Sequence, residues 1–345
     1  MKIAVYSPTI RRKEMDAVLT ALVEDKIGPG EQERVLLRTA RDFLGFEQCV
    51  ALRSPAMALA LALKTLGLAA GSGVLLSALS PRYYRLVIED SGLCPRYVDV
   101  APSQACITRR TIEAALSACP NPPGCILIHH TLGYAPDTEA LAETGLPVIE
   151  DISQSYGTLA GERIAGSVGA LTILGLEEQD MLTAGGGALL FAPRKREGAA
   201  LRNQGNLPKE YGLPDMNAAL AIVQFRESEK NLAKRKEIAQ AYIRSSLRTR
   251  HKTLVRQDGE SYNHYAFPLI LATGTGVKEV KAYARQKDIP VENAFGNEDT
   301  LVEAAGKAAC PEAYALSLRT VRFPLYPRLG ASEVEKVAKL IGSLP

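Results

Sequence analysis

Tryptophan is absent from this 345-residue sequence, and aromatic residues make up only 6% of it. No basic stripe alternates with aromatic side chains, so the pattern of a nucleic-acid groove is missing. No stretch approaches the roughly 18 apolar residues of a membrane-spanning helix, and the N-terminus lacks the apolar core of a signal peptide. The sequence therefore predicts a cytoplasmic protein with neither a nucleic-acid nor a membrane partner.

Cysteine usage and charge narrow the class further. The six cysteines lie far apart, at positions 49, 94, 106, 119, 125 and 310, without a C-x-x-C pair. This spacing supports neither a zinc site nor a disulfide framework, and it favours reduced thiols. The net charge is only +3 at pH 7, and 46% of the residues are hydrophobic. Such a composition is typical of a globular chain long enough for one large and one smaller domain.

Short apolar runs alternate with amphipathic stretches in the first part of the chain. The runs cover residues 74–76, 96–100, 124–129, 146–150, 171–174 and 188–191. Each is apolar on both faces and is followed by turn or polar residues, as expected for buried strands of a mostly parallel sheet. We therefore predict a large α/β domain over residues 1–230.

Beyond these runs the pattern changes. Residues 218–247 are rich in Ala, Glu, Lys and Arg, and they predict one long helix. A strand is predicted at 265–271, a helix at 277–287 and a closing helix from Ser332. Together these elements predict a smaller α+β domain over residues 231–345.

Six segments resemble a single protein family, in the same order and over nearly the whole chain. They are GPG at 28–30, an H-x-x-G-x-x-x-D pattern at 130–137, LPVIEDISQ at 146–154, GSVG at 166–169, the stretch 211–219, and FPLYP at 323–327. They resemble the DegT/StrS-type sugar-nucleotide aminotransferases, which are pyridoxal phosphate enzymes of fold type I. The resemblance implies a large domain with a mostly parallel central sheet, a smaller C-terminal α+β domain, and a homodimer with active sites at the subunit interface.

Asp151 and Gln154 match two cofactor-binding positions of the family. The resemblance implies that the acid contacts the pyridine nitrogen of the cofactor and that the glutamine lies near its ring hydroxyl. Asp151 follows an apolar strand, and the carboxyl ends of such strands commonly bind ligands. The sequence also allows Asp151 merely to cap the turn after the strand.

The lysine that forms the cofactor imine in the family has no counterpart here. Alignment on the flanking glycines without gaps places Asp180 at its position, and a shift of one residue places Gln179 there. No lysine occurs between Lys64 and Lys195. Neither a carboxylate nor a carboxamide can form an imine, so we expect no covalently bound cofactor.

The phosphate-binding positions of the family are substituted as well. Its Ser-Gly-Thr at a helix start becomes Ser54-Pro55-Ala56, where proline has no N–H and alanine has no hydroxyl. Ser54 and Pro55 nevertheless predict a good helix start. The family's serine before the lysine aligns with Gly175, and the asparagine that a partner subunit contributes aligns with Glu210. These substitutions predict that the helix remains and its anion site is lost.

The aromatic residue that covers the cofactor ring in the family is also missing, because residues 78–81 are Ala-Leu-Ser-Pro. Tyr83 and Tyr84 lie nearby, and we interpret them as packing residues on a helix face. His130 matches a family histidine. A lone histidine beside a strand is usually a packing residue, and contact with a ligand is the alternative.

Three functions are compatible with these residues. The losses favour a non-catalytic homologue, without a bound cofactor, that binds a small molecule, a nucleotide-sugar or an active paralogue. The second is a pyridoxal phosphate-dependent aminotransferase of amino-sugar or surface-polysaccharide biosynthesis. The third is a lysine-free enzyme resembling the family's sugar dehydratases, which use a loosely held aminated cofactor. The choice rests on the site, because the fold alone does not define a function.

Overall fold

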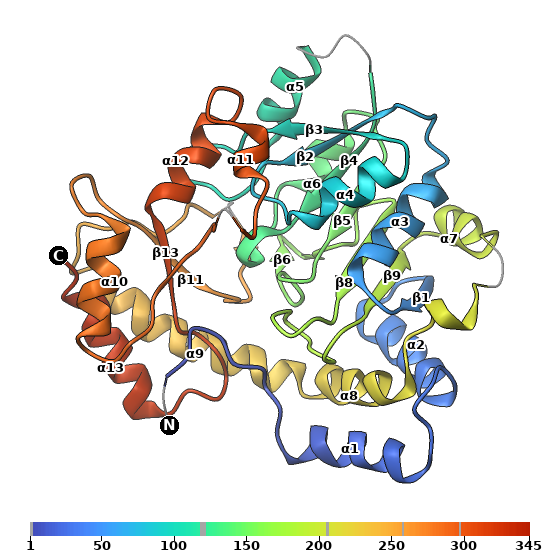
Figure 1. The fold of residues 1–345 in the computed structure, drawn as a ribbon, viewed down its shortest axis with the longest axis horizontal. Coiled ribbons are helices and arrows are strands. Elements are labelled where there is room, and N and C mark those ends of the chain that lie inside the picture. The colour runs from blue at the N-terminus through green and yellow to red at the C-terminus, as the bar shows by residue number, and fades with distance from the viewer. Residues whose placement is uncertain (1–2, 118–121, 205–206, 257–258, 297) are drawn as a thin grey trace.

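The largest feature of the computed structural model is a seven-stranded sheet with the order β1-β9-β8-β5-β4-β2-β3 (Figure 1). The structure describes residues 3–117, 122–204, 207–256, 259–296 and 298–345. The strands of this sheet are β1 (Gln48–Leu52), β2 (Gly73–Ser77), β3 (Cys94–Val98), β4 (Pro123–His129), β5 (Val148–Asp151), β8 (Leu171–Gly175) and β9 (Ala188–Ala192). Strands β3, β2, β4, β5 and β8 pair in parallel, whereas β9 pairs antiparallel with both β8 and β1. The predicted mostly parallel sheet is confirmed.

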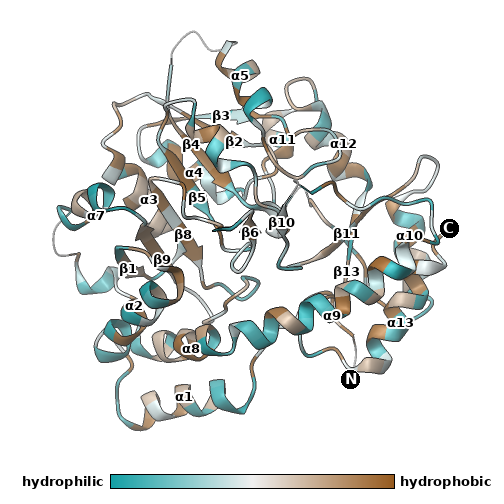
Figure 2. Cartoon of the chain, turned by 180° about the vertical axis from the view of Figure 1, so that it is seen from behind, coloured by the Kyte–Doolittle hydropathy of each residue, from teal (hydrophilic) through white to brown (hydrophobic). Residues whose placement is uncertain are grey.

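Both faces of this sheet are buried, which explains why its strands are continuous apolar runs. On one face Leu76, Ile149 and Ile173 pack with residues of α3 (Pro55–Leu66) and α4 (Tyr83–Asp90). On the other face the cluster around Val148 includes residues of α5 (Arg109–Ser117) and α6 (Thr138–Ala142). Figure 2 shows the central strands as the hydrophobic centre of the molecule.

Helices surround the sheet and form much of the C-terminal part. The remaining ones are α1 (Arg12–Val23), α2 (Glu31–Leu44), α7 (Lys195–Arg202), α8 (Asp215–Arg226), α9 (Ser228–Ser246), α10 (Val277–Arg285), α11 (Val302–Ala305), α12 (Pro311–Arg319) and α13 (Ala331–Gly342). Two short 3₁₀ helices span Thr131–Gly133 and Lys209–Tyr211. None of the helices within the described residues is long and apolar enough to cross a membrane.

Two smaller sheets complete the fold. One is formed by β6 (Leu159–Ala160), β7 (Arg163–Ile164) and β10 (Glu260–Ser261), and the other by β11 (Phe267–Ile270), β12 (Glu292–Asn293) and β13 (Thr320–Phe323). The second sheet packs with α9, α10 and α13 in a separate apolar cluster. The predicted C-terminal α+β region is therefore present, and its proposed boundary after residue 230 falls inside α9.

The single helix predicted at 218–247 is wrong, because the chain forms two helices, α8 and α9. They meet at Glu227, whose ψ of 1° is not helical. No glycine or proline marks the break. The bend is decided by tertiary contacts instead, since α8 packs against α1 and α2 whereas α9 packs against α13 (Figure 1).

Candidate functional site

Asp151 ends β5 on the face of the sheet that α3 and α4 cover. Its carboxylate is engaged by groups of the same chain. Oδ1 accepts hydrogen bonds from the backbone N–H of Ser153 at 2.9 Å and from the Ser153 hydroxyl. Oδ2 accepts a hydrogen bond from the Tyr84 hydroxyl at 2.5 Å, and Nδ1 of His129 lies 3.8 Å away. Asp151 is only 1% exposed, so these groups enclose it.

Tyr84 reaches Asp151 from α4 and is fully buried. Its ring contacts the rings of Tyr83 and His129 edge to face, with centroid separations of 4.9 and 6.0 Å. The interpretation of Tyr84 as a packing residue is thus incomplete, because its hydroxyl also binds the acid of the candidate site.

Burial and hydrogen bonding determine the protonation states of Asp151 and Tyr84. Burial alone would raise the pKa of Asp151, but the nearby His129 ring, together with hydrogen bonds from Ser153 and Tyr84, brings that pKa below its ordinary value. Burial, followed by the charge of Asp151, raises the pKa of Tyr84 well above its usual range. Asp151 is therefore a carboxylate and Tyr84 a neutral phenol that donates to it.

Asp180, which the resemblance places at the position of the family's lysine, is half-buried beside the end of β8. Its Oδ2 accepts a hydrogen bond from the backbone N–H of Glu177 at 2.8 Å. A Cβ atom added to Gly175 would lie 2.3 Å from that oxygen and 2.8 Å from Oγ of Ser153. Glycine at position 175 is thus required by the present place of Asp180. Burial, and then the negative charge of Asp151, raises the pKa of Asp180 well above its ordinary value.

Two tyrosines from distant parts of the chain hold the segment around Asp180. Tyr265 donates to the carbonyl of Gln179 at 2.9 Å, and Tyr6 donates to the carbonyl of Glu178. The backbone N–H of Gly175 donates to the Ser153 hydroxyl at 2.7 Å, which in turn donates to Asp151. Gln179 is the other candidate for the lysine position. Its defined contact is made by the backbone carbonyl and not by a side-chain group that could react.

The helix start predicted at Ser54 is confirmed. Ser54 is the N-cap of α3, its Oγ accepts from the backbone N–H of Met57 at 3.2 Å, and Pro55 follows as the first helical residue. The Ser54 hydroxyl oxygen is thus used within the helix, and Ala56 adds no polar group. Glu210 is exposed in the 3₁₀ helix Lys209–Tyr211.

Gln154 is half-buried and holds a strained turn. Its Oε1 accepts from the backbone N–H of Leu132 at 2.6 Å, and Leu132 has a positive φ of 56°. The position next to a cofactor ring that the resemblance implies for Gln154 stays a prediction.

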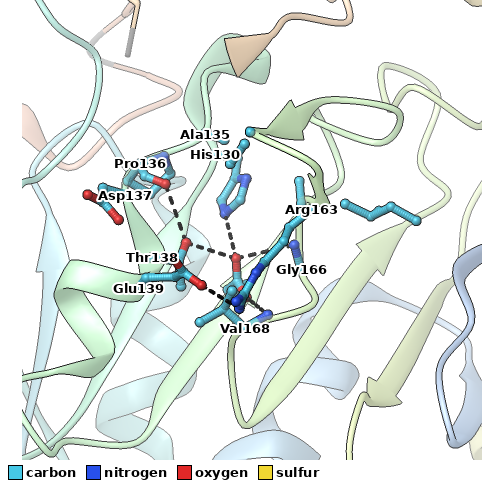
Figure 3. A pocket seen from close by; sticks show the side chains of 14 residues that line it. His130, Ala135, Pro136, Asp137, Thr138, Glu139, Arg163, Gly166 and Val168 are labelled. Carbon is cyan, nitrogen blue, oxygen red and sulfur yellow. Dashed lines mark hydrogen bonds and ion pairs between the residues drawn. The ribbon is translucent and has the colours of Figure 1, made fainter. Parts of the chain in front are cut away.

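His130 lies on the opposite side of β5 from the Asp151 carboxylate. Its Nδ1 is 2.8 Å from Oγ of Ser155, and its Nε2 is 3.2 Å from Oε2 of Glu150. Glu150 also accepts from Thr138 at 3.0 Å and from Gly169 N–H at 2.6 Å. His130, Glu150 and Thr138 line a cavity of about 230 Å³ (Figure 3). A ligand contact of His130 stays a prediction, and it concerns this cavity rather than Asp151.

Sequence reasoning missed Tyr84, His129 and Ser153 as partners of Asp151. For His129 a signal existed, because alternate residues of a strand point to opposite faces. His129 and His130 are adjacent, and His129 pairs with Asp151 across the parallel register of β4 and β5. For Tyr84 no local signal existed, because its partner is distant in sequence.

The residues present do not fit pyridoxal phosphate. The acid that the resemblance assigns to the ring nitrogen is enclosed by Tyr84, the position that it assigns to the lysine carries a carboxyl group, and at the helix start Pro55 has no N–H and Ala56 has no hydroxyl. Within the described residues, no group of three His, Cys, Asp or Glu residues could hold a metal ion either.

The chain is similar over almost its entire length to known proteins. Residues 8–342 match the model of the DegT/DnrJ/EryC1/StrS aminotransferase family. A dTDP-4-dehydro-2,3,6-trideoxy-D-glucose 4-aminotransferase from Saccharopolyspora spinosa is 25% identical over 373 aligned positions, which cover 97% of this chain and 95% of the relative. An L-glutamine:scyllo-inosose aminotransferase from Streptomyces griseus is 29% identical over 168 residues, covering 47% of this chain and 39% of the relative.

Solved structures share the fold at low sequence identity. The aminotransferase TlmJ from Streptoalloteichus hindustanus superposes with a TM-score of 0.88 at 19% identity, covering 99% of this chain and 98% of the other. A GDP-4-keto-6-deoxymannose-3-dehydratase superposes with a TM-score of 0.85 at 15% identity, covering 98% and 100%. The predicted type I fold is thereby confirmed.

Proposed function

Since this chain belongs to the DegT/DnrJ/EryC1/StrS aminotransferase family, we propose that it is a non-catalytic member, which binds a small ligand or a partner protein without covalent pyridoxal phosphate chemistry. One observation carries this proposal. A carboxyl group, that of Asp180, stands where the resemblance places the imine-forming lysine, and its oxygen occupies the space that any side chain at position 175 would need. A carboxyl group cannot form an imine or shuttle the proton that a lysine amine would carry.

The charge around Asp180 supports the same proposal. Burial and the charge of Asp151 raise the pKa of Asp180, because a second negative charge is unfavourable in a buried place beside a carboxylate. Glu177 adds another carboxylate to this segment. A phosphate dianion would meet these charges at a helix start where Pro55 has no N–H and Ala56 has no hydroxyl to donate.

The two enzymatic alternatives make different predictions. An aminotransferase needs a lysine that forms an imine, and the sequence has no lysine between Lys64 and Lys195. A dehydratase that uses an aminated cofactor needs no lysine, but it must bind the cofactor ring and phosphate tightly enough to hold them. The relatives described above are named as aminotransferases or as a dehydratase. Their names alone do not assign either reaction to this chain.

The test is the visible spectrum of the purified protein with pyridoxal phosphate, before and after borohydride reduction, followed by peptide mass spectrometry. We expect no imine absorption and no reduced label on a lysine beyond the level seen with the unfolded chain. Stoichiometric label on one lysine of the folded protein would overturn the proposal. Saturable binding of pyridoxamine phosphate without a reducible imine would favour the dehydratase-like alternative instead.

We also propose that the chain forms a homodimer in the cytoplasm, as the resemblance implies. An exposed apolar stripe on and just after α1 supports self-association, and it consists of Met15, Leu19, Leu22, Val23 and Ile27. Contiguous exposed apolar residues of this kind are unusual on a monomer. Sedimentation analysis should show a dimer that Leu19→Glu converts to monomer, whereas an unchanged dimer would place the interface elsewhere.

A further inference from the structure

We propose that Tyr84 is a built-in occupant of the cofactor site: its phenol takes the carboxylate of Asp151 that the family offers to the cofactor ring, and the site has become part of the core. This inference rests on the proposed non-catalytic function and specifies where the ligand of this chain does not bind. Any ligand or partner then binds outside the Asp151 site.

The contacts of Asp151 leave no route for an external ring. Its two oxygens accept from Ser153 and Tyr84, and the whole residue is 1% exposed. An external molecule reaches Oδ2 only if the Tyr84 side chain leaves. The enclosure is made by a single chain, so it does not depend on a partner subunit.

Tyr84 is not free to leave. It is 0% exposed and belongs to the apolar cluster that contains Leu76 and Ile88. The backbone N–H of Tyr84 also donates to the carbonyl of Pro81 at 3.1 Å, which holds the start of α4. Moving the ring out would expose its apolar surface and leave Oδ2 of the buried Asp151 carboxylate without its donor.

A second pair of residues closes the site from the β8 side. The Asp180 carboxyl group and Gly175 fit together, because a side chain at position 175 would collide with Asp180 Oδ2. Tyr83 is close enough to both acids that burial, followed by the charges of Asp151 and Asp180, raises its pKa well above its usual range. Residues of α4 and of the segment after β8 therefore fill the site around Asp151 together.

Removal of the ring should recreate a ligand site with defined chemistry. Tyr84→Ala would leave a ring-sized cavity with a buried carboxylate at its end, and cavities of this kind bind small aromatic molecules. Phenol should bind as a donor to Asp151. The cation of 4-aminopyridine should bind as well, because it combines an aromatic ring with a charged N–H donor.

Thermal unfolding measures this directly. We expect Tyr84→Ala to lower the Tm by about 10 °C, and millimolar phenol or 4-aminopyridine to restore part of the loss. Neither compound should raise the Tm of the unmodified protein. The combined variant Tyr84→Ala/Asp151→Asn should keep the response to phenol and lose the response to 4-aminopyridine.

Tyr242 supplies a matched control. It is also 0% exposed, and its hydroxyl donates to a neutral group, the carbonyl of Pro324, at 2.9 Å. Tyr242→Ala should respond to phenol but not to 4-aminopyridine, because a carbonyl offers no countercharge. If 4-aminopyridine stabilises both alanine variants equally, or stabilises neither, the built-in occupant is refuted.

Tyr84→Phe tests the hydrogen bond even where the alanine variant fails to fold. It keeps the ring and removes the donor, so the Tm should fall by about 5 °C. An unchanged Tm would overturn the inference. The two proposals fail separately: a lysine-linked imine refutes the non-catalytic function, whereas binding of 4-aminopyridine by the unmodified protein refutes only the occupied site.

Discussion

Glu150 and Asp151 are consecutive residues of β5, and their side chains lie on opposite faces of the same sheet. Both are buried carboxylates with pKa values below the ordinary range. Glu150 accepts from backbone N–H groups of Gly166, Val168 and Gly169 and borders a cavity (Figure 3). Asp151 accepts mainly from side chains and is enclosed.

The difference between these two acids explains how a site can lose its catalytic groups while the surrounding fold is retained. Backbone donors do not change when side chains are substituted, so the contacts of Glu150 last as long as the turn at 166–169. Two of the three donors to Asp151, the Ser153 and Tyr84 hydroxyls, are side chains, and Tyr84 could replace the ring of a cofactor without altering β5. The contacts of Glu150 therefore depend on the backbone fold, whereas those of Asp151 depend mainly on the side chains that surround it.

The largest effect is expected on the Glu150 side. Glu150→Ala removes the acceptor for three backbone N–H groups and the Thr138 hydroxyl, and it should cost about 3–5 kcal/mol of unfolding free energy. Urea denaturation measures the loss. Glu150→Gln, which keeps the volume and one acceptor oxygen, should cost clearly less. A loss under about 1 kcal/mol for the alanine variant would show that the turn needs no acceptor.

The contacts of Glu150 also predict how the stability of the protein depends on pH. Burial opposes ionisation of Glu150, but His130, Gly169 and Thr138 lower its pKa below the unfolded value. The unfolded chain then binds the proton more tightly, so this contribution is complete above about pH 4.3 and is lost as the pH falls through the folded pKa. The stability difference between the normal protein and Glu150→Ala should therefore shrink on acidification. A constant difference down to low pH would contradict the assignment.

At Asp180, on the Asp151 side of the sheet, the expected pH dependence of stability has the opposite sign to that at Glu150. Burial and the charge of Asp151 raise its pKa, so the folded state binds the proton more tightly than the unfolded chain. Ionisation of Asp180 then costs stability, starting near pH 4 and increasing until its folded pKa is passed. Asp180→Asn should stabilise the protein by the order of 1 kcal/mol at neutral pH, and the gain should vanish in acid. A destabilised variant at pH 7 would contradict this account.

The smallest expected effect belongs to restoration of the lysine. Asp180→Lys should give no measurable imine with pyridoxal phosphate, because Tyr84 still covers Asp151 and the helix start still lacks an N–H at Pro55 and a hydroxyl at Ala56. The absorption spectrum before and after borohydride reports the result. A yellow protein with reducible label at position 180 would show that the enclosure of Asp151 opens readily.

Much of the fold was predictable because it depends on local patterns. The apolar runs specify strands buried on both faces, and Ser54 with Pro55 specifies a helix start through hydrogen bonding within a few residues. The break between α8 and α9 was not predictable, because Glu227 is an ordinary helix residue and the bend follows from packing against other helices.

The candidate site divides in the same way. Asp151 and the missing lysine were visible in the sequence, since they are matters of residue identity at positions that the resemblance defines. His129 was missed in favour of His130, because the choice between adjacent residues depends on which face of β4 points to Asp151.

What the sequence by itself determined is chemical: no lysine between Lys64 and Lys195 means that no folding of this segment could supply an amine. What only the tertiary structure decided is spatial. Tyr84 lies 67 positions from Asp151 in the chain, and the two meet only because α4 packs on the sheet at the end of β5. A missing group can be read from residues one at a time, whereas a group that takes its place is recognised only when distant residues are brought into contact.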